Sequence, residues 1–380
     1  MMEGWEKFKL KELLEIKYGK DHKKLKDGIY PLYGSGGIMR YVDAFLYDDE
    51  SILIPRKGTL TNLFYLNIPF STVDTMFWSK VNKEKVFPKF LYYLLKTYDL
   101  SLLDVGAAIP SLTTKVLKEV SVTIPKSKET QRKIASILSA YDDLIENNLK
   151  RIKLLEEQAQ QTYEEWFVRF KFPGYEDVDI DEESGLPVGW EKKRFDKLVI
   201  LQRGFDLPSR LRVEGNVPIF ASTGITDYHN EFKVKGPGII TGRSGTLGQV
   251  QFTSEDFWPL NTALWVKKYF NCGPIYVLHF LRSLDLARFG GGSAVPSLDR
   301  KVVHSQIITI PDKVLINDFE NGVSPIFKTI QNLQNQNQHL KEARDILLPR
   351  LMSGMIDVDS LEVDEGLGMV AEESEKYNKD

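Results

Sequence analysis

The sequence predicts an α+β fold in which two similar mixed α/β domains are separated by two long helices, which pair as an antiparallel coiled coil with a pseudo-twofold internal repeat. The second half of the chain repeats short motifs of the first half, and a long segment of helical periodicity follows each copy. The copies are about 186 residues apart, far more than the roughly 20–50 residues of a solenoid repeat. The repeating unit is therefore a whole domain followed by a helix.

Repeated motifs and turn residues place the two domains. The motifs are Gly-Trp-Glu-Lys (4–7 and 189–192), Arg-x-Gly-Thr (56–59 and 243–246) and Ser-Leu (111–112 and 297–298). Around them, short strand candidates alternate with Gly, Pro, Asn and Asp, and each copy has a short helix candidate with proline in its first turn. These patterns predict one domain at residues 1–126 and, after an acidic linker, a second domain within residues 173–312.

The long helices are predicted at residues 127–172 and 313–356. In both, apolar residues recur at alternating spacings of four and three, as in a coiled coil. One asparagine interrupts each row at an equivalent place, and a buried asparagine in such a seam fixes the register at some cost in stability. Packing of each helix on its own domain is the alternative. The predicted seam consists of Ile134, Leu138, Tyr141, Asn148, Ile152, Leu155, Val323, Ile330, Leu333, Asn337 and Leu340.

The charge distribution is compatible with a nucleic-acid ligand. The net charge is −3, but acidic residues concentrate at 176–183 and in the tail at 357–380, which we predict to be disordered. Without that tail, 48 basic residues stand against 44 acidic ones. The domains are therefore mildly basic, which fits either DNA binding or a solvated surface of mixed charge.

Several classes of protein are disfavoured. A single cysteine, the lack of an apolar run of about 18 residues and a polar N-terminus predict a cytoplasmic protein without a membrane span. The five histidines have no metal-ligand spacing, and no Walker loop, nucleophile elbow or zinc-protease motif is present. Asn-Ile-Pro-Phe at 67–70 resembles the base-gripping loop of adenine-N6 methyltransferases, but no glycine-rich cofactor motif precedes it. We therefore predict a binding protein with no catalytic residues, metal or cofactor of its own.

The chain resembles the specificity subunit of type I restriction–modification enzymes. The resemblance rests on the Gly-Trp opening of each domain and on four helical or flanking segments. These segments are QRKIASIL at 131–138, DDLIENN at 142–148, WFVRFKFPG at 166–174 and LLPRLMSG at 347–354. The resemblance covers nearly the whole chain apart from the tail, and the helical segments are its specific part.

This resemblance implies a division of labour. Each domain would be a target recognition domain that reads one half of a split, asymmetric sequence in double-stranded DNA. The helices would set the gap between the halves and dock two methyltransferase subunits, and restriction subunits would complete the complex. S-adenosylmethionine, ATP and Mg would belong to those partners, and this subunit would catalyse nothing. About 43 helical residues span roughly 64 Å, or roughly 19 base pairs.

The residues predicted to contact DNA lie mostly on loops and helix starts at equivalent places in both domains. Arg, Asn, Ser and Thr can read base edges, whereas Lys, Arg and backbone amides bind phosphates. The structural alternatives for these positions are tight turns, helix caps or solvated side chains. The predicted set is Ser35, Gly36, Arg40, Arg56, Lys57, Thr59, Asn62, Thr113, Thr114, Lys115, Arg203, Ser222, Thr223, Arg243, Ser244, Thr246, Asn261, Arg300 and Lys301.

Two other functions stay open at this point. One is a bivalent scaffold or DNA-binding protein that acts without a restriction complex. The other is a stand-alone adenine methyltransferase, which would show activity with S-adenosylmethionine in the purified chain. Exposed helical faces also leave open a homodimer of the free chain.

Overall fold

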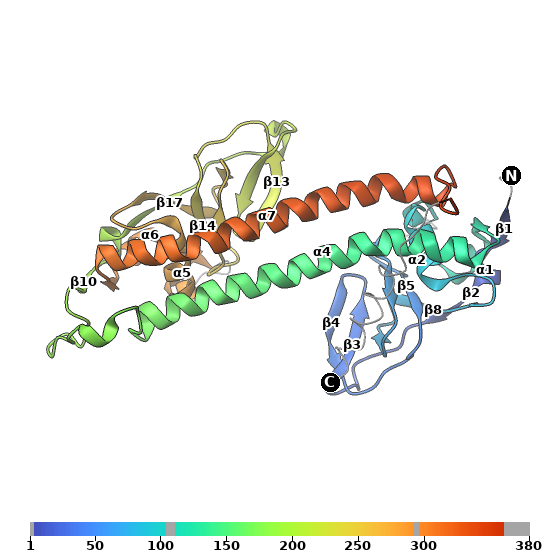
Figure 1. Cartoon of the computed structure of the whole chain (residues 1–380), viewed down its shortest axis with the longest axis horizontal. Helices are drawn as coiled ribbons and strands as arrows, with labels where there is room; N and C mark the ends of the chain where they lie inside the picture. The colour runs from blue at the N-terminus through green and yellow to red at the C-terminus, as the bar shows by residue number, and fades with distance from the viewer. Residues whose placement is uncertain (1–3, 104–110, 292–295, 361–380) are drawn as a thin grey trace. The chain divides into compact units, whose positions relative to one another are not determined.

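The computed structural model describes residues 4–103, 111–291 and 296–360. The chain forms two compact units (Figure 1). The first unit comprises residues 1–149 and 335–380, and the second unit comprises residues 150–334. The division thus falls inside the long helices, and each unit contains one copy of the repeated domain with part of both helices. No helix in the described ranges is long and apolar enough to cross a membrane.

The domain of the first unit is built on two small sheets. A four-stranded antiparallel sheet has the order β2-β8-β5-β6, and a three-stranded sheet has the order β4-β3-β7, in which β3 and β7 are parallel. The strands are β2 (Leu14–Tyr18), β8 (Met76–Val81), β5 (Ser51–Pro55), β6 (Phe64–Leu66), β4 (Gly37–Val42), β3 (Asp27–Gly34) and β7 (Ser71–Thr72). Every residue of β5 is buried, as its apolar run Ile52-Leu53-Ile54 predicts, so this strand lies within the core.

Short helices and a terminal strand pair complete this domain. β1 (Trp5–Lys9) pairs antiparallel with β9 (Ser121–Pro125). The helices are α1 (Leu10–Leu13), α2 (Pro88–Lys96), η1 (Leu100–Leu103) and α3 (Thr114–Glu119). Pro88 starts α2 in the first turn, where the missing N–H has no helical partner to lose.

The domain of the second unit repeats this topology. Its four-stranded sheet has the order β11-β17-β14-β15 and its three-stranded sheet has the order β13-β12-β16. The strands of these sheets are β11 (Val199–Arg203), β17 (Ala263–Tyr269), β14 (Gly238–Gly242), β15 (Val250–Thr253), β13 (Gly224–His229), β12 (Val217–Ala221) and β16 (Trp258–Pro259). Two further pairs of strands are β10 (Glu191–Arg194) with β20 (Ile307–Ile310), and β18 (Gly290–Gly291) with β19 (Ser297–Leu298). The helices are η3 (Tyr175–Asp177), η4 (Phe195–Lys197), η5 (Ser209–Leu211), α5 (Pro274–Ser283), η6 (Leu286–Phe289) and α6 (Arg300–Ser305). The strand order matches that of the first unit, so the predicted duplication holds for the topology of the domains.

The long helices are α4 (Lys128–Tyr163), which continues as a π-helical turn η2 (Glu164–Val168), and α7 (Lys313–Met352). In the first unit the side-chain amide of Asn148 donates to Asn337 over 2.9 Å, and Arg344 donates to Asp142 over 2.5 Å. Residue numbers rise along α4 while they fall along α7, so the two segments run antiparallel there. In the second unit, Ile152 of α4 packs with Ile330 and Leu333 of α7.

The ends of the helices pack on the domains. Ile134 and Leu138 belong to the core of the first domain, and Val323 belongs to the core of the second. Tyr141, Leu155 and Leu340 are half-buried. The helices therefore combine both predicted arrangements, since their inner turns contact each other and their outer turns contact a domain.

The first unit also takes up residues beyond α7. Val358 is buried in the core of this unit, and the hydroxyl of Thr130 donates to the carboxylate of Asp359 over 2.8 Å. Packed chain thus continues past residue 356, where the tail was predicted to begin. The rest of that acidic tail, residues 361–380, lies outside the described residues.

Candidate nucleic-acid interface

A loop junction joins the repeated motifs in each domain. In the first domain the backbone N–H of Leu112 donates to the carbonyl of Arg56 over 2.9 Å, and Lys57 bridges to Ser111. In the second domain Leu298 donates to the carbonyl of Arg243 over 2.7 Å. Ser244 bridges to Ser297 there. Motifs that are about 50 residues apart in the sequence therefore lie side by side in both copies.

A third segment, the hairpin turn after β3 or β12, completes each junction. Asn62 donates its side-chain amide to the carbonyl of Ser35 over 2.9 Å. Gly58 has a φ of 89°, and a Cβ there would lie 3.1 Å from the hydroxyl of Ser35. In the second domain Gly245 has a φ of 83° and faces Ser222 in the same way, at 3.9 Å. Glycine suits both loop tips because of the left-handed backbone.

We name these junctions the first and second loop clusters. The first consists of residues 35–36, 56–62 and 111–115, and the second consists of residues 222–223, 243–246, 261 and 297–301. Most of the predicted DNA-contacting residues fall in these clusters, and Lys57, Thr59, Lys115, Thr223, Thr246, Arg300 and Lys301 are exposed there. Their contact with DNA stays a prediction.

Some predicted contact residues have structural partners. Arg40 lies on β4, where its guanidinium pairs with Asp27 and donates to the carbonyls of His22 and Leu25. Thr113 caps α3 by accepting the N–H of Val116. The side-chain amide of Asn261 donates to Asp206. These three side chains already have partners within the protein. Arg40 therefore has a structural role in its domain, Thr113 is a helix cap and Asn261 stabilises a turn.

The second loop cluster contains a hollow of about 490 Å³ lined by three arginines. Arg203 comes from the end of β11, Arg243 follows β14 and Arg300 begins α6. Asp299 also lines the hollow, where its carboxylate accepts the N–H of Lys301 and caps α6. Leu264 and Leu298 form its apolar part.

The first domain presents different side chains on the same framework. Tyr18 ends β2 as Arg203 ends β11, and Thr114 begins α3 as Arg300 begins α6. Arg56 lies over the ring of Tyr18, with 5.5 Å from its guanidinium carbon to the ring centroid, and donates to the carbonyl of Asp74 over 3.2 Å. A hollow of about 500 Å³ borders this junction at Ser35, Gly36 and Asp74. The sequence reasoning missed Tyr18, although its position in the repeat matches Arg203.

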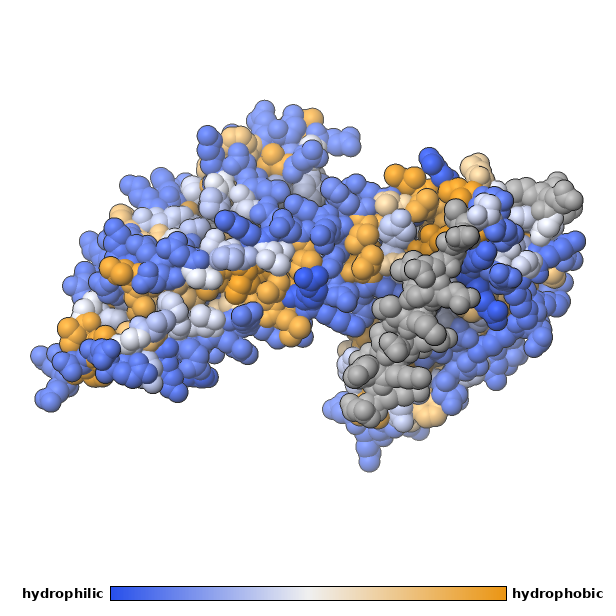
Figure 2. Space-filling model, in the orientation of Figure 1, coloured by the Kyte–Doolittle hydropathy of each residue, from blue (hydrophilic) through white to orange (hydrophobic). Residues whose placement is uncertain are grey.

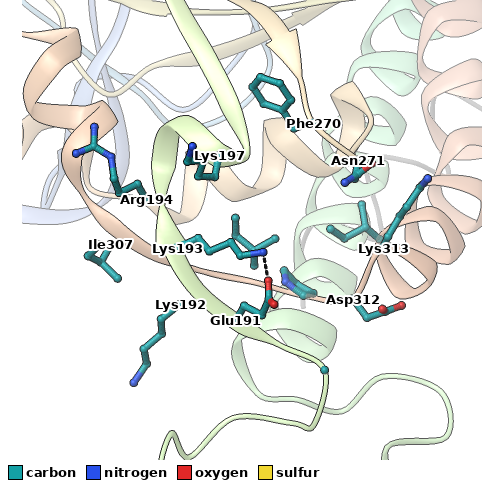
Figure 3. A pocket seen from close by; sticks show the side chains of 14 residues that line it. Glu191, Lys192, Lys193, Arg194, Lys197, Phe270, Asn271, Ile307, Asp312 and Lys313 are labelled. Carbon is teal, nitrogen blue, oxygen red and sulfur yellow. Dashed lines mark ion pairs between the residues drawn. The ribbon is translucent and has the colours of Figure 1, made fainter.

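A larger basic hollow of about 890 Å³ lies between the β10–β20 pair and the start of α7 (Figure 3). Here the cations have acidic neighbours, since Lys193 pairs with Glu191 and Arg194 pairs with Asp196. The hydrogen bonds from Arg194 hold the pKa of Asp196 below its usual value. Arg212, which follows η5, likewise lowers the pKa of Asp227 on β13. Lys193, Arg194 and Arg212 are thus paired with carboxylates, unlike the three arginines of the smaller hollow.

Apolar side chains are exposed on the long helices. In the first unit they include Leu144, Leu149 and Ile346, and in the second unit Leu154 and Val314. Figure 2 shows apolar surface over the helical segments of both units. Within the described ranges no group of three or more His, Cys, Asp or Glu side chains is placed to hold a metal ion.

Two copies of one domain, each with a loop cluster at the same place, define a protein built by internal duplication of a domain. The family model described as type I restriction modification DNA specificity domain matches the chain twice, at residues 2–157 and 187–342. The chain therefore belongs to the family of type I restriction–modification specificity subunits, which are non-catalytic components of their complexes.

Individual relatives agree with this assignment. The specificity subunit of type I restriction enzyme MjaIX from Methanocaldococcus jannaschii is 32% identical over 83% of this chain and 80% of its own length. A putative type I specificity subunit from Mycoplasma pneumoniae is 22% identical over 88% of this chain and 96% of its own. The crystal structure of the S subunit from M. genitalium shares the fold, with a TM-score of 0.60 at 18% identity, and the match covers 91% of this chain and 96% of that one.

Proposed function

We propose that each domain of this specificity subunit reads one half of a bipartite, asymmetric DNA target. The recognition domains are assigned to residues 1–126 and 173–312. One observation carries the proposal: both domains hold a loop cluster on the same backbone framework but with different side chains at its tips. A shared backbone framework with different side chains on its loops suits two domains that bind the same polymer at different base sequences.

The helices are proposed to form an antiparallel coiled coil that fixes the gap between the half-sites, with the two domains related by a pseudo-twofold axis. Their lengths of 36 and 40 residues, and the asparagine pair between them, support this role. The exposed leucines on their outer faces offer surfaces for two methyltransferase subunits, which would bring S-adenosylmethionine. Restriction subunits with ATP and Mg would complete the complex. In the free chain the same faces offer a surface for a homodimer, and the expected compartment is the cytoplasm.

Methylation profiling of the host genome tests the proposed function. We expect methylated adenines in both halves of one gapped motif, and their loss in a strain that lacks this chain. A continuous methylated motif, or a gapped motif that persists without the chain, would contradict the proposal. Mixed-sequence duplex separates the DNA-binding role from a protein scaffold, because phosphate contacts make the affinity fall as salt rises.

A paired deletion tests the spacing role. Residues 149–155 and 330–336 face each other across the helix pair, as Ile152 does with Leu333. Removing both segments keeps the seam in phase and shortens the pair by about 10 Å, or about three base pairs. We expect a changed gap or a loss of methylation, whereas the original gap would rule out a ruler.

A further inference from the structure

We propose that the second domain binds one phosphate of the DNA backbone in the hollow formed by Arg203, Arg243 and Arg300, and that the first domain has no equivalent phosphate site. This inference rests on the proposed function, because it assumes that the second loop cluster faces DNA. It assigns a phosphate group as the ligand of this cluster, and it implies that the two recognition domains differ in how they bind the DNA backbone.

Backbone contacts bring the three arginines together. Arg203 pairs across the sheet with Leu264, which also pairs with Thr241 two residues before Arg243. The hydrogen bond from Leu298 to the carbonyl of Arg243 then draws in the start of α6, where Arg300 lies. Three segments that are 40 or more residues apart therefore place one cation each on the same hollow.

The charge in this hollow is not balanced by the protein. None of the three guanidiniums forms an ion pair with a described residue, and the hydrogen bond of the Arg243 side chain goes to the neutral carbonyl of Asn261 over 3.3 Å. Among the described residues that line the hollow, Asp299 is the one acidic residue; its carboxylate caps α6 and offsets one charge, so three guanidiniums still leave an excess of two positive charges. Three converging like charges repel each other, so an anion in the hollow would stabilise the domain. By contrast, Arg40 and Arg212 each have a carboxylate partner.

The arrangement suits a phosphate better than a base edge. A guanine edge takes one guanidinium, which donates to its O6 and N7 atoms. A phosphate carries a full charge and accepts hydrogen bonds from several directions, so three guanidiniums can bind it together. The buried Leu264 and Leu298 keep part of the hollow apolar, which strengthens these charge contacts.

The first domain lacks this cation set. Tyr18 and Thr114 occupy the places of Arg203 and Arg300, which leaves Arg56 as the cation that corresponds to Arg243. Arg56 is stacked on Tyr18 and hydrogen-bonded to Asp74. The second domain should therefore contribute more of the salt dependence of DNA binding.

The test replaces the arginines with the residues of the first domain. The full chain, assembled with its methyltransferase subunits, carries Arg203→Tyr and Arg300→Thr and binds a duplex that contains the gapped target. Neither side chain has a hydrogen-bond or ion-pair partner among the residues that the structure describes, so the fold should tolerate the changes. We expect an affinity loss of about tenfold or more that is equal across base sequences, and a slope of log affinity against log salt that is shallower by about one. Lys267→Ala, which removes an exposed charge elsewhere in the same domain, should leave both quantities nearly unchanged.

Neutral methylphosphonate linkages locate the contact. Scanned through the second half-site, one linkage should weaken binding by the wild-type complex, and the same linkage should have a much smaller effect on the double variant, which keeps only Arg243 of the three arginines. A change in base preference in the double variant would overturn the phosphate assignment, and so would independent effects of variant and linkage. All of these measurements start from a wild-type complex that binds the gapped target. If the proposed function is wrong, no such target is found, and this result is distinct from any outcome of the phosphate test.

Discussion

The two recognition domains share their strand order and loop junction but differ in the side chains at that junction. The contacts that join the Arg-x-Gly-Thr and Ser-Leu motifs are made by main-chain groups, such as the N–H of Leu112 and the carbonyl of Arg56. Main-chain contacts do not depend on side-chain identity, so Tyr18 and Arg203, or Thr114 and Arg300, can replace each other on one framework. The comparison shows how a duplicated domain can acquire a second binding preference without a change of topology.

The helices show a second kind of difference between the units. At an offset of 189 residues, which relates Asn148 to Asn337, Phe319 on α7 corresponds to Thr130 on α4. Phe319 packs in an aromatic cluster with Tyr163, Phe167 and Tyr276, whereas Thr130 donates to Asp359. The same helical position therefore packs against the domain by apolar burial in the second unit, and bonds to the segment after α7 in the first.

The largest expected effect comes from this pair. Phe319→Ala should destabilise the second unit by about 3–5 kcal/mol, because it leaves a cavity among buried rings. Thr130→Ala should destabilise the first unit by about 1–2 kcal/mol, because it removes one hydrogen bond to a carboxylate. Hydrogen exchange on the full chain, followed peptide by peptide, measures both units at once. Equal losses in the two units would show that the two anchors are equivalent.

The asparagine pair should give an intermediate effect. Asn148 and Asn337 are only 6% and 5% exposed, so Asn337→Leu buries an unpaired amide and should cost about 1–3 kcal/mol in the first unit. Replacing both residues with leucine should recover most of this loss, because no buried polar group then remains. Thermal unfolding of the two single variants and the double variant forms a cycle that measures the coupling. Additive losses would mean that the amides do not interact.

The smallest expected effect is a change in pH dependence. Glu320 accepts the N–H groups of Ile275 and Tyr276 at the start of α5, and burial raises its pKa above the ordinary value of 4.5. Because the pKa is raised in the folded state, the protonated carboxyl of Glu320 contributes to the stability of the second unit. This contribution is fully present below pH 4.5 and is lost as pH rises through the folded pKa.

Glu320→Gln should therefore reduce the slope of the free energy of unfolding of the second unit against pH, in the range that begins near the unfolded pKa. At the equivalent place the first unit has Gln131, whose amide accepts the N–H of Phe87 and cannot titrate in this range. Gln131→Ala, which changes no titrating group, is the matched control and should shift the level of stability without changing its slope. An unchanged slope in Glu320→Gln would assign the pH dependence to another group.

The fold could be predicted further than the site. The repeated motifs and the helical periodicity predicted two domains and two long helices with one asparagine at an equivalent place in each, because these depend on local patterns that survive in the sequence. The hydrogen bond between Asn148 and Asn337 is a finding of the structure. The contact between the Arg-x-Gly-Thr and Ser-Leu motifs could not be predicted, since it depends on strand order. The arginine hollow was missed for the same reason, although each of its three arginines was among the predicted residues.

The composition of the first unit has a consequence for biosynthesis. Leu351, Met352 and Val358 complete its core, so the amino-terminal domain awaits residues that the ribosome adds only after the whole second unit. Residues 150–334 form a continuous stretch and can fold before translation ends. The usual order of completion is thereby reversed, and a nascent chain that stops before α7 ends would leave its earliest-made domain unfinished.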